Sequence, residues 1–267
     1  MSAVELQLLD TSRPRSIRFV RKGALIPETY AAARHWDRTR SVDANIARIR
    51  AENVIGAGSA AWLHDVTNTL AARFRSGGGL EPLVALAQSG LPIEHWRDCL
   101  LWHLGQQDAM WFDFLTTWLY PAYGNGAVHM QTEDVEPFVI TQTSGRAARG
   151  KGLTADSVNR VARDLLGMAA AFGLLRGKLV REFAGYHLAD MGILYVLHAL
   201  AQREANGQRI IEAPEWQMFL LSASDVEQEL LRLHQFQRLD YQVAGSLVQL
   251  RLPYPSLLAY VESVAHG

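Results

Sequence analysis

The sequence predicts a mainly α-helical protein of two helical domains, the second winged-helix-like with a short β-hairpin. Apolar residues recur at helical spacing through most of the chain, and the period changes from 3.6 to 2 only near residues 239–252. At 267 residues and 49% apolar content, the chain can bury a substantial core. The expected domains are residues 1–144 and 153–267, joined by a linker at 145–152.

The N-terminal domain is expected to hold a series of short helices. They are predicted at residues 42–54, about 59–75, 81–88, 93–104 and 108–119. Ser41 is suited to cap the first of them, Pro92 to open the fourth, and Pro121 to end the last. Four tryptophans fall in the last two helices and are expected mainly to pack in the core: Trp96, Trp102, Trp111 and Trp118.

The linker precedes an amphipathic helix that runs from Thr154, a plausible N-cap, to about Phe172. The stretch 144–152 contains three glycines and three cations, which favour mobility and phosphate binding. One face of the helix is apolar, through Val158, Val161, Leu165, Met168 and Phe172. Arg160 and Arg163 are expected on the opposite face.

The C-terminal third is expected to contain two further helices, at 186–202 and 215–221, before a winged-helix module. A capping box at 224–227 would open a helix, and two alternating strands joined by a turn at 244–246 would follow it. A closing helix is expected at 256–264. The helix near 225–237 carries Asp225, Glu227 and Glu229, which repel phosphate, so this module is expected to dock a protein partner.

Charge is segregated along a chain whose net charge is only −1. Residues 13–50 hold ten basic and three acidic residues, a balance of +7, and residues 146–181 hold eight and two, a balance of +6. Residues 76–145 have a balance of −7. Nearly all the cations are arginines, whose planar guanidinium suits phosphate oxygens and base edges. A polyanion partner is therefore predicted, with DNA or RNA as the first candidate.

Catalytic and metal chemistry are not expected. Cys99 is the only cysteine, which excludes a cysteine-based zinc site and an intramolecular disulfide, and it is expected to be a buried apolar residue. The histidines are scattered, with no carboxylate at ligand spacing, and no phosphate-binding loop or nucleophile elbow occurs. We expect no cofactor, no metal, no small-molecule substrate and no enzymatic activity. No stretch is long and apolar enough to span a membrane, so a soluble cytoplasmic protein is expected.

Several segments, taken in order, resemble the BrxA family of BREX phage-defence systems. They are Gly23-Ala24-Leu25-Ile26-Pro27-Glu28-Thr29, Arg48-Ile49-Arg50-Ala51-Glu52-Asn53-Val54-Ile55, the helix from Leu153 to Leu175 with its Gly-Leu-Leu end, and Leu239-Asp240-Tyr241-Gln242-Val243-Ala244-Gly245. The similarity covers about residues 13–262. The resemblance implies a small, non-catalytic, mostly helical protein that binds DNA and assists a larger defence assembly.

The resulting hypothesis is an accessory protein that binds duplex DNA through its two arginine-rich blocks, mainly at phosphates and with low sequence specificity. The candidate DNA-binding residues are Arg13, Arg15, Arg18, Arg21, Lys22, Arg34, Arg38, Arg40, Arg48, Arg146, Arg149, Lys151, Arg160 and Arg163. The alternative is a protein-protein adaptor whose arginines dock acidic surfaces of other BREX proteins. RNA binding by the N-terminal half is a third, weaker option.

Overall fold

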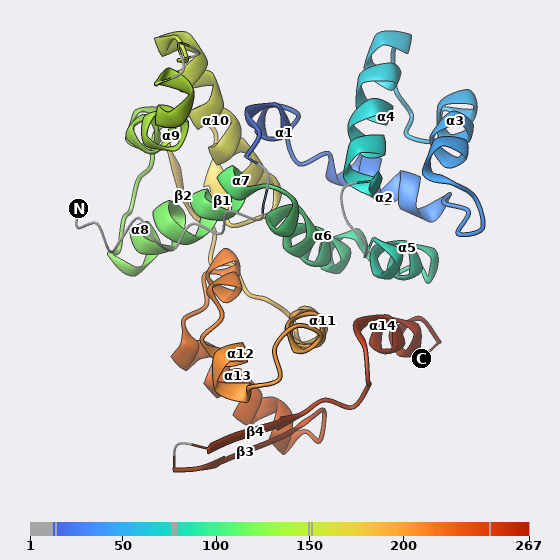
Figure 1. The fold of residues 1–267 in the computed structure, drawn as a ribbon, viewed down its shortest axis with the longest axis vertical. Helices are drawn as coiled ribbons and strands as arrows, with labels where there is room; N and C mark the ends of the chain where they lie inside the picture. The colour runs from blue at the N-terminus through green and yellow to red at the C-terminus, as the bar shows by residue number, and fades with distance from the viewer. Residues whose placement is uncertain are drawn as a thin grey trace. The chain divides into compact units, whose positions relative to one another are not determined.

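The computed structural model describes residue 13 and residues 15–75, 80–148, 150, 152–245 and 247–266. These residues form two compact units, each assembled from separate stretches of the chain. Unit 1 consists of the described residues up to Ala24, Leu104–His187 and Gln217–Leu220, and unit 2 consists of the remainder. The predicted mainly helical fold is confirmed, with two small antiparallel hairpins (Figure 1).

Unit 1 is built on two long helices that pack against each other, α9 (Thr132–Ala147) and α10 (Ala155–Ala171). Its other elements are α1 (Ile17–Arg21), the end of α6 (Ile93–Gln107), α7 (Ala109–Asp113), a π-helical segment (Phe114–Leu119), α8 (Tyr120–Gly124), β1 (Leu175–Gly177) and β2 (Arg181–Phe183). The short helix α1 packs on α10 and α7.

The core of unit 1 lies under the apolar face of α10. The five predicted core residues of this helix region are all buried: Val158, Val161, Leu165, Met168 and Phe172. The Phe114 ring stacks on Trp111 and Trp118, with ring centroids 5.8 and 5.2 Å apart. Thr154 caps α10 by accepting a hydrogen bond from the Ser157 N–H, as predicted.

Unit 2 contains the early helices and the C-terminal third. Its elements are α2 (Ile26–Arg34), α3 (Val42–Glu52), α4 (Ala60–Arg75), α5 (Glu81–Gln88), most of α6, α11 (Asp190–Ala201), α12 (Gly207–Ile211), α13 (Ala223–Gln235), β3 (Asp240–Ala244), β4 (Leu247–Arg251) and α14 (Leu257–His266). A short 3₁₀-helix, Pro214–Phe219, begins in the part of the chain assigned to unit 2 and ends in the part assigned to unit 1.

The helices predicted in unit 2 form largely where the sequence places them. Ser41 caps α3, whose Ile46 and Ile49 pack in a cluster with Val66 and Leu70 of α4. Trp96, Trp102 and Trp111 are buried, as predicted for the core, while Trp118 is partly buried. Cys99 is also buried, and burial raises the pKa of its thiol well above the usual value.

Two helix boundaries differ from the prediction. Pro121 does not end its helix, because the helical run continues through it to Gly124. The missing N–H of Pro121 costs little there, since the preceding π-helical turn already interrupts the regular α-helical bonding. The segment predicted as a helix from residue 186 becomes helical only at Asp190.

The capping box at the start of α13 lies two residues earlier than predicted. Ser222, not Ser224, accepts from the Asp225 N–H, and the Asp225 carboxylate accepts from the Ser222 N–H at 2.8 Å. The hairpin β3–β4 follows α13, and Tyr241 pairs with Leu250 in its register. The winged-helix character of this C-terminal module stays a prediction.

Among the described residues, no helix combines the length and hydropathy that a membrane crossing requires.

Candidate nucleic-acid interface

The first basic block is divided between the two units. Residues 13–22 belong to unit 1, together with the described part of the second block, whereas Arg34, Arg38, Arg40 and Arg48 belong to unit 2. The two groups are therefore considered separately.

The N-terminal segment is held on unit 1 by two aspartates of distant sequence. Ser16 caps α1 through its hydroxyl, and its backbone N–H donates to Asp108 Oδ2 at 2.8 Å. The Arg15 guanidinium lies 2.6 Å from Asp113 Oδ2. These contacts fix the short helix, which alone has too few residues to be stable.

Arg13 and Arg15 thus anchor the segment. Arg13 donates to Gln106 Oε1 at 2.9 Å, and its guanidinium lies 3.9 Å from the centre of the Phe112 ring. The cations beyond this anchor, Arg18 and Arg21, are exposed on α1, and Lys22 at its C-terminal end is partly buried.

The outer face of α10 carries Arg160 and Arg163, both exposed, as the sequence predicts. Within the described part of the chain, neither makes a hydrogen bond or ion pair with another side chain. The same holds for Arg18 and Arg21 of α1. Four guanidinium groups of unit 1 are therefore available to an external anion.

The cations of α1 and α10 meet in an open hollow. Its lining includes Arg21 and Lys22 from the α1 region, Arg163 and Asp164 from α10, and Arg181 from β2. A second hollow beside it is lined by the α1 segment, including Arg18 and Arg21, and by Leu153 just before α10. We name the cationic set Arg18, Arg21, Lys22, Arg160, Arg163 and Arg181 the α1–α10 surface.

Asp164 is the carboxylate of this surface. Partial burial raises its pKa, while the guanidinium groups of Arg163, Arg21 and Arg160 act in the opposite direction. All three arginines thus act electrostatically on one aspartate, although Arg21 is far from the others in sequence.

Arg181 is a member that the candidate set did not contain. It lies on β2, where its backbone pairs with Met130 and its guanidinium donates to the Gly177 carbonyl at 3.3 Å. Burial lowers the pKa of Arg181. The sequence signal for Arg181 was its position at the end of the second basic block. The strand that carries it, β2, was not predicted.

The predicted linker region is only partly described. The helix α9 extends through Ala147 and so covers the backbone of Arg146, whose side chain lies outside the described part. Arg149 and Lys151 also lie outside the described residues. The connection containing them joins two helices of the same unit, α9 and α10.

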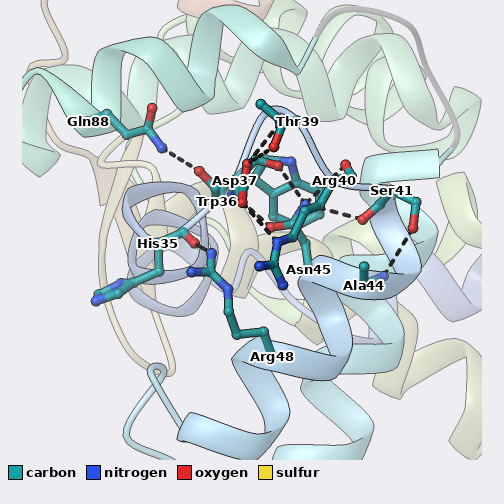
Figure 2. Close-up of polar contacts among 10 residues, drawn as sticks. All are labelled: His35, Trp36, Asp37, Thr39, Arg40, Ser41, Ala44, Asn45, Arg48 and Gln88. Carbon is teal, nitrogen blue, oxygen red and sulfur yellow. Dashed lines mark hydrogen bonds and ion pairs between the residues drawn. The ribbon is translucent and has the colours of Figure 1, made fainter.

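In unit 2, Arg40 and Arg48 lie at the connection between α2 and α3 (Figure 2). Arg40 forms an ion pair with Asp37 at 2.9 Å, and Arg48 donates to the His35 carbonyl. These two side chains have structural partners. Arg34 and Arg38 are exposed.

Asn45 organises this connection from beneath. Its side chain is fully buried and donates to the carbonyls of Asp37 and Ser41 at 2.8 and 3.2 Å. Its Oδ1 accepts from the Asp37 N–H at 2.8 Å. Figure 2 shows these bonds converging on the loop, while Gln88 of α5 donates to the Trp36 carbonyl from another side.

His103 has a side-chain hydrogen-bond partner in unit 2. His103 is bonded to the Tyr195 hydroxyl at 2.6 Å, and burial lowers its pKa to about 3, so it is neutral. No group of three or more histidine, cysteine or carboxylate side chains is arranged within the described residues to hold a metal ion. Asp190, three positions after His187, forms an ion pair with Arg232.

The model of the BrxA family matches residues 14–194. No curated protein matches the sequence significantly. Because the matched region covers more than half of the chain, the protein belongs to the BrxA family and is a BREX-associated defence protein.

Proposed function

We propose that this protein binds duplex DNA without catalysing a reaction, chiefly by contacting phosphates and with little sequence preference. The observation that carries the proposal is the convergence of α1, α10 and β2 on one surface of unit 1. Arginines from both basic blocks share this surface, and within the described residues four of them form no hydrogen bond or ion pair with another side chain.

Phosphate contact is favoured over base reading by the side chains that α10 presents. Arg160 and Arg163 are its exposed cations. Asn159, an amide of the kind that reads adenine, is partly buried and donates to Glu136 Oε1 at 2.8 Å. Because this amide is already hydrogen-bonded, α10 presents mainly positive charge. This charge can contact the phosphate backbone of DNA of any sequence.

The test compares paired arginine substitutions by fluorescence anisotropy with a labelled duplex of mixed sequence. Arg160→Gln/Arg163→Gln and Arg18→Gln/Arg21→Gln should each weaken binding about tenfold, since two exposed charge pairs contribute roughly 1.4 kcal/mol. Arg209→Gln on α12 and Arg251→Gln on β4, two exposed cations of unit 2 outside the candidate set, are controls that should bind within about twofold of the unsubstituted protein.

Equal losses in the controls, or no loss in the α1–α10 variants, would overturn the proposed surface. Failure of the unsubstituted protein to bind any duplex at low salt would instead favour the adaptor hypothesis. In that case, capture of acidic BREX proteins should survive nuclease treatment and should require the same arginines.

A further inference from the structure

The hairpin β1–β2 presents an unusual tip next to the α1–α10 surface. Gly177 pairs with Arg181, so residues 178–180 form the turn. Leu179 at this tip has 89% of its surface exposed, and Val180 has 45%. Adjacent apolar side chains that are exposed together form a patch of the kind that can mark an interaction site.

The base of the hairpin is firmly held. Met130 and Arg181 exchange backbone hydrogen bonds of 2.8 and 2.9 Å, which place Met130 as a third strand position beside β2. Leu175 is buried, and the Phe183 ring meets Tyr123 edge to face with centroids 5.0 Å apart. The exposed tip therefore extends from a hairpin base that is held by backbone hydrogen bonds and side-chain packing.

The turn also has a specific backbone requirement. Gly177 has φ +96°, and a Cβ at this position would lie 2.3 Å from the Val180 carbonyl oxygen. Only glycine fits this close approach. The chain is thereby folded back tightly, and Lys178 and Leu179 project at the end of the hairpin.

The order of elements around the hairpin is that of a winged helix. Met130 is followed by α9, then by α10, and then by the hairpin that pairs back to Met130. In such a module the second helix lies in the major groove. Here that helix is α10, whose outer face carries Arg160 and Arg163.

We propose that the β1–β2 tip is a wing that inserts Leu179 into the DNA minor groove beside the groove occupied by α10. The inference deepens the proposed function and rests on it. An apolar side chain flanked by cations is the combination that wedges into minor grooves, where cations contact the adjoining phosphates. Lys178 supplies a cation at the tip, and Arg181 of the same hairpin lines the α1–α10 surface.

The experiment uses the full chain with a wedge-deficient variant, Leu179→Ser, and a wedge-preserving variant, Leu179→Met. Val128→Ser is the matched control, because Val128 is 64% exposed in the same unit and lies outside the turn at residues 178–180. Leu179→Ser should weaken duplex binding about fivefold, with an unchanged salt slope because no charge is lost. Leu179→Met and Val128→Ser should bind within about twofold of the unsubstituted protein.

A second readout locates the contact on DNA. Methylation of adenine N3, which faces the minor groove, should be reduced by the unsubstituted protein and restored with Leu179→Ser. The inference is overturned if Leu179→Ser binds as tightly as Val128→Ser, or if adenine N3 stays fully reactive while Arg160→Gln/Arg163→Gln still weakens binding. Absence of all duplex binding by the unsubstituted protein would overturn the proposed function and the wing together.

Discussion

Arg15 and Asp113 form an ion pair of 2.6 Å that joins the start of the described chain to the end of α7. Only 6% of the Asp113 side chain is exposed. Together with the bond from the Ser16 N–H to Asp108, this pair determines where α1 lies and therefore where Arg18 and Arg21 point. The position of the candidate DNA-binding arginines thus depends on two carboxylates about ninety residues away.

Replacing Asp113 should loosen α1 without removing a cation. We expect Asp113→Ala to accelerate amide hydrogen exchange in residues 17–21 about fivefold, because the partly exposed pair contributes about 1 kcal/mol. Hydrogen-exchange mass spectrometry measures this directly. Asp43→Ala, which removes the exposed partner of Arg75 in unit 2, is the control and should leave α1 unchanged. Unchanged exchange in α1 with Asp113→Ala would show that the pair does not hold the segment.

The carboxylate of Asp164 should oppose the approach of a phosphate. Asp164→Asn is expected to tighten duplex binding about fivefold, since it removes a like charge beside Arg21, Arg160 and Arg163. Its pKa is raised, so protonation on acidification should strengthen binding by the unsubstituted protein while the Asn variant responds less. Anisotropy titrations at several pH values provide the check. Weaker or equal binding by Asp164→Asn, against Glu133→Gln on α9 as a control, would contradict this role.

Burial of Asp108 should make stability depend on pH. Desolvation raises its pKa to about 6 from 3.8, so the folded state holds a proton that the unfolded state releases between these values. The free energy of unfolding should therefore decrease by about 2 kcal/mol from pH 4 to pH 6 through this group alone. The measurement is the difference in urea midpoint between the unsubstituted protein and Asp108→Asn across this range. A difference that does not vary with pH would refute the assignment.

The connection between α2 and α3 should depend on the side-chain amide of Asn45 (Figure 2). Asn45→Ala is expected to lower the free energy of unfolding by about 3 kcal/mol, because it leaves several buried backbone groups of residues 37–41 without partners. Asn68→Ala, an exposed amide on α4, should cost less than about 1 kcal/mol. Chemical denaturation compares the two. Similar costs for both variants would mean that the loop is held by other contacts.

The parts of the fold that the sequence predicted well are those determined by neighbouring residues. Ser41 and Thr154 each cap a helix within three residues, and the apolar face of α10 follows from helical spacing alone. The alternating strands of β3–β4 have the same local origin.

The parts that the sequence did not predict depend on distant contacts. β1 and β2 have three residues each, and part of their pairing is with Met130, so no alternating pattern develops. The helix α1 has five residues and is held by Asp108 and Asp113. Charge counting therefore identified the arginines but could not show that Arg21 and Arg163 share a surface with Arg181.

The salt dependence of duplex binding tests the central claim most directly. The logarithm of the association constant should be measured against the logarithm of salt concentration for the unsubstituted protein and for the variant with Gln at positions 18, 21, 160 and 163. If these four arginines contact phosphates, the slope should decrease in magnitude by about three to four units, at roughly 0.9 for each contact. An unchanged slope in a folded variant would contradict the assignment of the α1–α10 surface as the DNA-binding site.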